Sequence, residues 1–312
     1  MIPKVTWSYR PGHALAMQGD GHVLADYVFA PTVAAKPYVH PVQTVAGIPM
    51  TAYQPSDHVW HRGIWFAWKY INGVNYWEEE VRAAEGGRQL SDGRTTPVGV
   101  ETVTYENGAA AVVHEVSYTA PGGTETIHET RRVTLRPPDA DGRFRLDFAH
   151  HFTVGAEEVT LDVTTVTPES PWGGYAGLGI RTARSLQRFR ALNDQGQEGD
   201  KANGSRSKWV DLSGVADGGV GIAAGVTFFA HPQNPRFPSP TYVFHKSEIF
   251  GYANLNPIRD EPMTLPAGAV LRLGYRIMIH DGVADPAAFD AEHADYAAIA
   301  PFGALSETGQ GD

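Results

Sequence analysis

Short strand-like runs separated by turn signals constrain this chain more than any other feature. In the run 143–154, residues at every second position fall on one face of a strand: Phe144, Leu146, Phe148, His150 and Phe152. Four further runs flank it at 98–105, 109–119, 125–135 and 159–166, and Asn107-Gly108 is a hairpin signal between the first two. The spacing predicts an antiparallel meander and not a series of βαβ units.

The second half of the chain has the same pattern. Strands are predicted at 207–212, 219–229, 241–250 and 269–280. The best helix candidate is 285–300, where Asp285 can cap and Pro286 takes the first helical position. We therefore expect an all-β fold, a large antiparallel β-sandwich, with this short C-terminal helix packed on it as a lid. No internal repeat or linker is evident, so a single domain over 1–312 is predicted, with a frayed tail at 306–312.

Composition excludes several classes of function. The formal net charge of −10 makes nucleic acid and anionic membranes poor partners. The chain has no cysteine, which excludes disulfides, thiolate metal sites and Cys nucleophiles. No stretch approaches the roughly 18 apolar residues of a membrane span, and the N-terminus lacks the pattern of a signal peptide, so a cytoplasmic protein is expected.

The segment 36–80 is the richest in side chains that bind small polar molecules. Tryptophan rings stack on the C–H faces of sugars, while imidazole, guanidinium and carboxamide groups bond to hydroxyls. This combination predicts a carbohydrate site. The candidates for substrate binding in this segment are Lys36, His40, Arg62 and Trp65, and those for catalysis are His58, His61 and Glu78.

The three-residue spacing of His58 and His61 also permits a metal site. On a tight turn both imidazoles can face one point, and His40 would complete a set of three ligands for a divalent ion. The alternative is that one ring caps a turn while the other packs. A bare H-x-x-H pattern does not separate the two.

Two neighbouring strands carry further ionisable groups. His150 shares the Phe148 face and is predicted to be a core histidine, while His151 lies on the polar face and is a candidate for catalysis. Glu129 and Arg131 share a face of the preceding strand. We expect them to form a solvent-exposed ladder of ion pairs.

Two loops add candidates for substrate binding. The proline-rich loop 231–240 would present His231, Asn234 and Arg236 with little flexibility, although a rigid closure of a sheet edge explains it equally well. The glycine-rich run 172–181 lacks the helix that a phosphate cradle needs. We interpret it as a strand with close backbone approach, to which Arg181 adds a polar group.

Several of these motifs together resemble a family of bacterial proteins labelled PmoA-like, after a component of a methane oxygenase. They span roughly residues 30–282: Lys36-Pro37-Tyr38, His40-Pro41, Asp57-His58, His61-Arg62-Gly63, Asn72-Gly73, Tyr76-Trp77, Tyr175 to Arg181, His231-Pro232, Asn234-Pro235-Arg236 and Glu261 to Gly268. A methane oxygenase component of that type is an integral membrane protein, and this chain has no membrane span, so that activity is set aside. The gene neighbourhoods of the family imply carbohydrate catabolism. The strand pattern also resembles the supersandwich of aldose-epimerase-type (galactose-mutarotase-like) proteins.

The leading hypothesis is an enzyme that acts on a sugar or glycoside by hydrolysis, elimination or epimerisation. His58, His61 or His151 would be the general acid or base, Glu78 its carboxylate partner, and Arg62 and Arg236 ligands for substrate oxygens. In one variant, a divalent metal bound by His40, His58 and His61, or by two of these with His151, polarises a carbonyl. The rival hypothesis is a carbohydrate-binding module or scaffold without catalysis. The sequence sets neither the sugar nor the oligomeric state.

Overall fold

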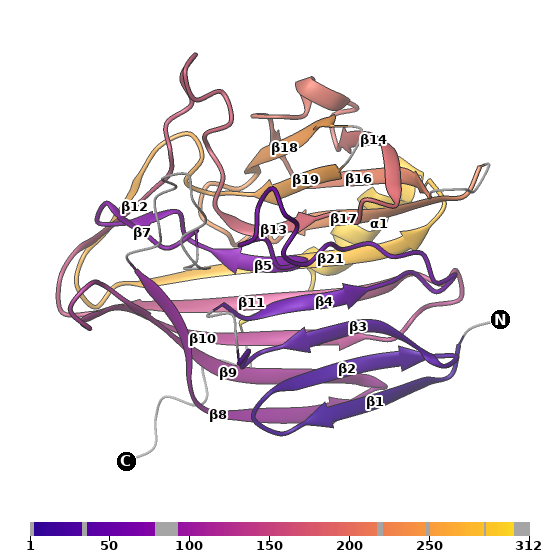
Figure 1. Cartoon of the computed structure of the whole chain (residues 1–312), viewed down its shortest axis with the longest axis horizontal. Helices are drawn as coiled ribbons and strands as arrows, with labels where there is room; N and C mark the ends of the chain where they lie inside the picture. Colours follow the sequence, from indigo (N-terminus) through magenta and orange to yellow (C-terminus); the bar gives the residue numbers. More distant parts are fainter. Residues whose placement is uncertain are drawn as a thin grey trace.

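The chain folds into two large antiparallel sheets packed face to face (Figure 1). The computed structural model describes residues 3–32, 36–78, 93–216, 221–247, 250–283 and 285–302. The predicted tail 306–312 and the start of the predicted strand 219–229 lie outside these ranges. Within them, the predicted all-β sandwich is confirmed.

The first sheet has nine strands within the described ranges and is nearest the viewer in Figure 1. Its strand order is β1 (Val5–Arg10), β2 (Ala14–Gly19), β3 (His22–Val28), β4 (Tyr38–Val42), β5 (Ile64–Ala67), β13 (Gly177–Arg181), β19 (Phe250–Leu255), β18 (Ser239–Ser247) and β15 (Arg206–Ser207). The N-terminal strands were not predicted, because the segment up to residue 80 lacks long alternating runs.

The second sheet, which lies behind the first, has eight strands in the part of the chain that the structure describes. Its order is β14 (Leu186–Asn193), β16 (Trp209–Ala216), β17 (Ala223–Ala230), β21 (Val270–Asp281), β11 (Phe144–Val154), β10 (Glu125–Arg136), β9 (Ala109–Thr119) and β8 (Arg94–Glu106). The predicted hairpin between β8 and β9 is confirmed, because Asn107 and Gly108 both have positive φ, as a type I′ turn requires.

The predicted five-stranded meander is correct for four strands only. β8, β9, β10 and β11 pair in sequence order, but the neighbour of β11 on its other side is β21. The next strand in sequence, β12 (Val159–Asp162), joins a small sheet with β20 (Met263–Leu265), β6 (Tyr70–Ile71) and β7 (Val74–Asn75). The predicted single strand 241–250 is likewise two strands, β18 and β19, which pair with each other.

Alternation sorts the residues of β11 as predicted. Phe144, Phe148 and Phe152 are buried in the main core between the two sheets. His150 is buried on the same face, as predicted, and its Nδ1 lies 2.7 Å from Oε1 of Glu129.

The predicted exposed ion-pair ladder is wrong for Glu129 and Arg131. Both side chains are at most 1% exposed, and Nε of Arg131 donates to Oε1 of Glu129 at 2.6 Å. Their face of β10 is the one that packs against the first sheet, so the charges lie inside the sandwich. Burial would raise the pKa of Glu129, but the charges and hydrogen bonds of Arg131 and His150 outweigh it and hold the pKa far below its usual range.

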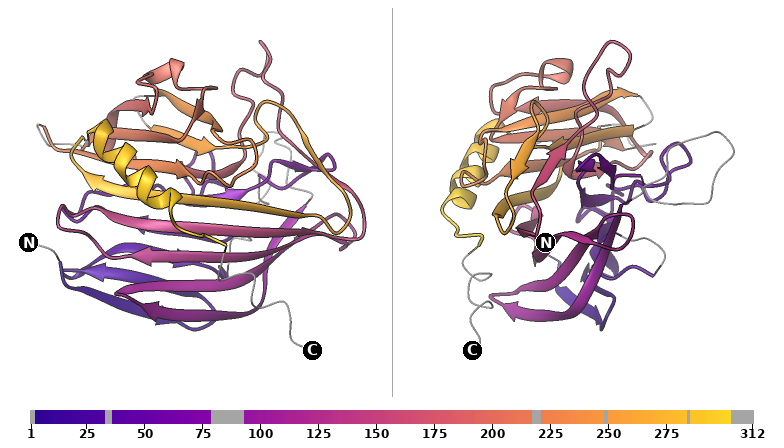
Figure 2. Two further views of the ribbon diagram at one scale, coloured as in Figure 1. Left: turned by 180° about the vertical axis from the view of Figure 1, so that it is seen from behind. Right: turned by 90° about the vertical axis from the view of Figure 1, so that its left-hand side faces the viewer.

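The predicted C-terminal helix is α1 (Pro286–Ala297). Asp285 is its cap and accepts a hydrogen bond from the backbone of Ala287 at 3.0 Å. Figure 2 shows that α1 covers the second sheet on the side away from the first. There Phe289 and Tyr296 cluster with Trp209 and Phe229. No helix in the described ranges has both the length and the apolar character to cross a membrane.

Candidate functional site

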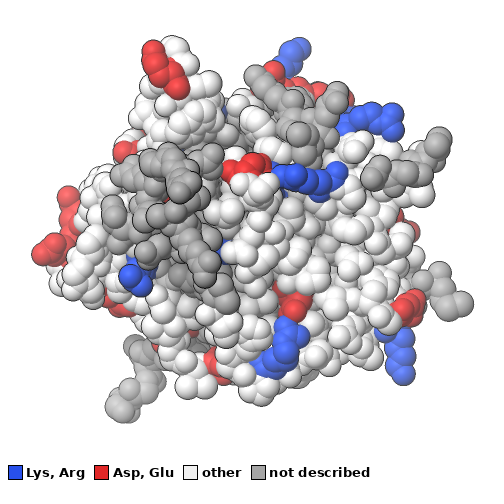
Figure 3. Space-filling view, in the orientation of Figure 1, with Lys and Arg blue, Asp and Glu red and all other residues white. Residues whose placement is uncertain are grey.

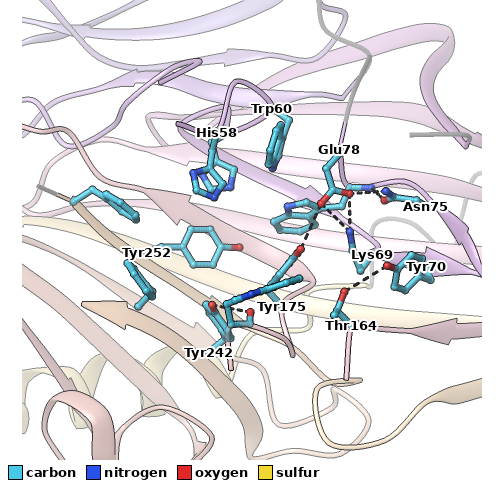
Figure 4. A pocket seen from close by; sticks show the side chains of 15 residues that line it. His58, Trp60, Lys69, Tyr70, Asn75, Glu78, Thr164, Tyr175, Tyr242 and Tyr252 are labelled. Atoms are coloured by element: carbon cyan, nitrogen blue, oxygen red, sulfur yellow. Dashed lines mark hydrogen bonds and ion pairs between the residues drawn. The ribbon is translucent and has the colours of Figure 1, made fainter. Parts of the chain in front are cut away.

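A cavity of about 650 Å³ opens on the outer face of the nine-stranded sheet, away from the main core and from α1 (Figure 4). Nine of its fifteen lining residues are Phe, Tyr or Trp. The lining consists of His58, Trp60, His61, Lys69, Tyr70, Asn75, Trp77, Glu78, Thr164, Trp172, Tyr175, Tyr242, Phe244, Phe250 and Tyr252. We call this cavity the aromatic pocket. Figure 3 shows charged side chains of both signs scattered over this face of the molecule.

Strand alternation supplies the floor of the aromatic pocket. On β5, Ile64 and Phe66 enter the main core, so Trp65 and Ala67 face the pocket side. Gly179 of β13 pairs with Trp65, and a Cβ at Gly179 would lie only 2.7 Å from the hydroxyl of Tyr252. Glycine at this position therefore makes room for the phenol of Tyr252.

A tight turn before β5 presents the two histidines. The backbone N–H of His58 donates to Pro55 and that of His61 to His58, both at 2.9 Å. The turn stacks the two imidazoles with their centroids 4.7 Å apart. Gly63 then leads into β5 with φ +74°, and a Cβ there would lie 2.5 Å from the carbonyl of Val39, so only glycine fits.

Asp57 connects the histidines to Arg181. Its carboxylate accepts from Nη2 of Arg181 at 2.5 Å and from Nη2 of Arg184 at 3.1 Å. The same carboxylate lies 3.1 Å from Nδ1 of His58. Burial would raise the pKa of Asp57, but the hydrogen bonds from Arg181 and His58 hold it well below its usual range. Asp57 is therefore ionised at neutral pH.

These contacts set opposite tautomers on the two rings. An ionised carboxylate can only accept, so Nδ1 of His58 carries a proton and Nε2 is the basic nitrogen of the neutral ring. A guanidinium can only donate, so Nδ1 of His61 accepts from Arg181 at 3.3 Å and Nε2 carries the proton. Burial, followed by the charges of His58 and Arg181, lowers the pKa of His61 well below 6.5 and keeps the ring neutral.

The other side of the aromatic pocket carries a fixed ion pair. Nζ of Lys69 donates to both carboxylate oxygens of Glu78 at 2.6 and 2.8 Å, and the carboxamide of Asn75 donates to the same group at 2.6 Å. The hairpin of β6 and β7 brings these side chains together, because its Asn72-Gly73 turn has φ values of 52° and 75°. Figure 4 shows this group across the pocket from His58.

Tyrosines from distant segments complete the wall. The hydroxyl of Tyr252 on β19 accepts from Asn254 at 2.9 Å, and Figure 4 shows it directed toward the middle of the pocket. The hydroxyl of Tyr175 donates to Glu78 at 3.4 Å. Burial raises the pKa of Tyr242 to about 12, so this phenol stays protonated.

Three of the sequence-predicted residues line the aromatic pocket, and three lie directly behind its lining. His58, His61 and Glu78 are in the lining. Behind it, Trp65 packs against His61 and Trp77 with centroids 4.8 and 5.5 Å away, and Nζ of Lys36 donates to the backbone carbonyl of Trp77. The guanidinium of Arg181 lies 3.4 Å from the centre of the Phe250 ring. Lys36, Trp65 and Arg181 are buried and position lining residues.

Two further predicted residues of the segment 36–80, His40 and Arg62, contact Thr51 and Tyr53 instead of the pocket. Nδ1 of His40 is 2.8 Å from the Thr51 hydroxyl, and its ring stacks on Tyr53. Arg62 is buried, and its guanidinium lies 5.1 Å from the centre of the same Tyr53 ring. Neither residue lines the aromatic pocket.

The predicted metal set of His40, His58 and His61 is not assembled. Nδ1 of His40 contacts the hydroxyl of Thr51, and the rings of His58 and His61 stack on each other with an interplanar angle of 24°. Throughout the described residues, no three His, Asp or Glu side chains are grouped to hold a metal ion.

The remaining predicted residues lie away from the pocket. His151 is on β11 between Thr130 and Arg272, on the outer face of the second sheet. Nε2 of His231 is 3.0 Å from the carbonyl of Ile299, and Asn234 donates to Gly274 at 2.8 Å.

Arg236 ties its loop to the segment 257–262 by donating to the carbonyls of Pro257, Glu261 and Pro262. The 231–240 loop therefore matches the alternative interpretation, a rigid closure. Its polar groups are used by neighbouring backbone, and the structure does not bring them to His58 and His61.

Most of the far wall was not predicted from the sequence. The lining side chains of β18 and β19, Tyr242, Phe244, Phe250 and Tyr252, alternate along two strands. Their two-residue spacing was the available signal, but it does not say which face is a pocket. Asp57 was noted only within a motif, because its role depends on Arg181, which is 124 positions away.

The pocket lies within a region that matches a protein family over most of its length. The family, described as a family of unknown function (DUF6807), matches residues 14–294. The chain belongs to this family. Its description names no methane-oxidising activity and gives no support to the PmoA-like label. Comparison with curated protein sequences gives no match.

Among solved structures, the DUF6807 chain is similar in fold to several sugar-related proteins. The GH36 α-galactosidase AgaB of Geobacillus stearothermophilus is 10% identical with a TM-score of 0.40; the match covers 89% of this chain and 41% of the enzyme. The chain thus spans about two fifths of that α-galactosidase.

Two shorter proteins match along nearly their whole length. A putative aldose 1-epimerase of Escherichia coli K12 is 11% identical with a TM-score of 0.35, covering 90% of this chain and 100% of the other. The Slr1438 protein of Synechocystis sp. PCC 6803 is 10% identical with a TM-score of 0.35, covering 90% and 96%. At such identities the likeness is one of fold.

Proposed function

We propose that this DUF6807 protein is an enzyme that acts on a sugar or glycoside bound in the aromatic pocket, with His58 as the general base. The observation that carries the proposal is the Asp57–His58 pair at the lining of a cavity walled by nine aromatic residues. Aromatic faces stack on sugar C–H groups, and the ion pair of Lys69 and Glu78, held by Asn75, offers fixed partners for hydroxyls.

The roles of the two histidines follow from their tautomers. Nε2 of His58 accepts a proton from the substrate, and the ionised Asp57 stabilises the imidazolium that forms. His61, neutral and protonated at Nε2, donates a hydrogen bond to a substrate oxygen on which charge develops. The Tyr252 hydroxyl, which accepts from Asn254, directs its own proton to the same space.

Real-time proton NMR in D₂O tests the proposal. A panel of aldoses and methyl glycosides is screened for binding by saturation transfer, and binders are followed for anomer exchange, C–H exchange, new reducing ends or unsaturated products. We expect at least one sugar to bind and turn over. His58→Gln should retain binding and lose about 10²–10⁴-fold in rate, while the control His151→Gln should match the wild type.

A non-catalytic carbohydrate-binding protein is the second candidate. The excess of aromatic over ionisable groups in the lining favours it. It predicts binding without conversion by the wild type and no effect of His58→Gln on affinity. Absence of binding by every sugar of the panel would overturn both candidates.

A further inference from the structure

The two ends of the aromatic pocket differ in chemistry. At one end, Lys69, Asn75 and Glu78 are joined by short hydrogen bonds. At the other end, the rings of Phe244 and Phe250 stack with centroids 5.3 Å apart and an interplanar angle of 21°. The cavity is therefore amphipathic along its length.

The polar end suits an uncharged polyol. Glu78 and Lys69 neutralise each other, so the described side chains of this end carry no net charge to select an acid or an amine. Their remaining hydrogen-bonding capacity, with that of Tyr175, is oriented before any ligand arrives, and Asn75 helps to hold Glu78 in place. Preorganised donors and acceptors of this kind recognise hydroxyl groups.

The apolar end offers little to a hydroxyl group. One face of Phe250 is covered by the guanidinium of Arg181 at 3.4 Å, and its further ring contacts among the described residues are with Phe244 and His58. Both phenylalanine rings are only partly buried although they line the cavity. Covering them with an apolar group would remove their exposed area from water.

The volume allows both ends to be filled at once. At about 650 Å³ the cavity lies in the range of about 300–1,000 Å³ typical of sites for drug-sized ligands, which are much larger than one pyranose ring. His58 contacts Phe250 at a centroid distance of 6.4 Å and faces the polar end across the pocket (Figure 4). It thus lies beside the junction of the two ends.

We infer that the pocket binds an amphipathic glycoside, with its uncharged sugar at Lys69, Asn75 and Glu78, its apolar aglycone against Phe244 and Phe250, and the glycosidic linkage beside His58. This inference rests on the proposed function and narrows its substrate class. A free monosaccharide fills only part of the site, and a disaccharide places hydroxyls against phenylalanine.

Calorimetric titration of the wild-type protein tests the inference. The sugar that binds best in the panel is compared as its methyl, phenyl and octyl glycosides and as a disaccharide. We expect the phenyl or octyl glycoside to bind at least about tenfold tighter than the methyl glycoside, a ratio that corresponds to about 1.4 kcal/mol, and tighter than the disaccharide.

A variant locates the effect. Phe244→Ala should bring the ratio between the affinities for the phenyl and the methyl glycoside down to about one. Phe244→Leu, which keeps an apolar side chain, should retain most of the advantage, and the exposed Tyr105→Ala on β8 should have no effect.

The outcomes separate this inference from the proposed function. Equal binding of methyl and phenyl glycosides, or tighter binding of the disaccharide, overturns the inference and leaves the sugar enzyme standing. If no panel sugar binds in any form, the proposed function fails and the inference fails with it.

Discussion

At the residue scale, the site depends on which nitrogen of each histidine carries the proton. Asp57 and Arg181 fix opposite tautomers on His58 and His61 through one carboxylate and one guanidinium. Without these two partners, neither contact that sets the tautomer of His58 or His61 would be present. Both histidines were identified from the sequence. Their separate roles could not be assigned from it, because Arg181, the partner of His61, comes from β13 and is distant in the chain.

The tautomers can be observed directly. In a long-range nitrogen–proton NMR correlation spectrum of the wild type, we expect His58 protonated at Nδ1 and His61 at Nε2 at pH 7. His61 should remain neutral as the pH falls below 6.5, because burial lowers its pKa well below that value. Asp57→Asn should remove the preference of His58 while His61 keeps its own; protonation of wild-type His61 at Nδ1 would contradict the assignment.

The lack of a side chain at Gly179 also shapes the pocket. Gly179→Ala should push the Tyr252 phenol out of place, because the new methyl group would lie 2.7 Å from its hydroxyl. We expect weaker sugar binding by calorimetry with the fold retained by circular dichroism. In a Tyr252→Phe background, which removes that hydroxyl, Gly179→Ala should cost less affinity; equal costs in both backgrounds would rule out this clash as the cause.

At the element scale, strand alternation decides which residues meet the core and which meet the pocket. It predicted β9, β10 and β11 closely. It failed where the pattern alone is ambiguous: on β10 the face that carries Glu129 and Arg131 is buried, because the second sheet is covered by the first there.

The buried pair on β10 gives a stability prediction. Glu129→Gln should cost about 3–5 kcal/mol, because it leaves the guanidinium of Arg131 in the core without its counter-charge. The double variant Glu129→Met with Arg131→Met should cost less than the single one, since no isolated charge remains. Urea unfolding measures both. A loss below about 1 kcal/mol for Glu129→Gln would mean that water reaches the pair.

At the scale of the whole molecule, burial of several histidines couples stability to pH. Burial lowers the pKa of His40 to about 4 and that of His114 to about 3, and that of His61 also lies well below 6.5. The unfolded chain binds protons on these residues below about pH 6.5, whereas the native protein does not. Stability should therefore be highest above pH 6.5 and fall as the pH drops toward 4.

The slope of this loss can be measured. Each such histidine contributes up to about 1.4 kcal/mol per pH unit to the decline between pH 6.5 and its native pKa. His114→Gln and His61→Gln should each make the decline in unfolding free energy shallower by about that amount in urea titrations at pH 7.5, 5.5 and 4.5. A slope unchanged in both variants would show that other groups cause the acid sensitivity.

Local patterns were enough to establish the class of the fold, because period-two alternation and turn residues act over short stretches of chain. They were also enough for the hairpin at Asn107-Gly108, the four-stranded run from β8 to β11, the capped helix α1 and a histidine-rich segment with His58, His61 and Glu78. Each of these depends on neighbours within a few residues or on one strand's own pattern.

Membership of the aromatic pocket, in contrast, depends on contacts between distant strands. β13 and β19 lie more than 100 residues beyond β5 in the chain, but in the sheet β13 pairs with β5 and β19 follows β13. This order brings Arg181 to Asp57 and Tyr252 to His61. The same strand order places His151, His231 and Arg236 away from the aromatic pocket. The physical reason is that sheet order follows the burial of whole faces, and a local pattern does not record which distant strand will cover or extend each face.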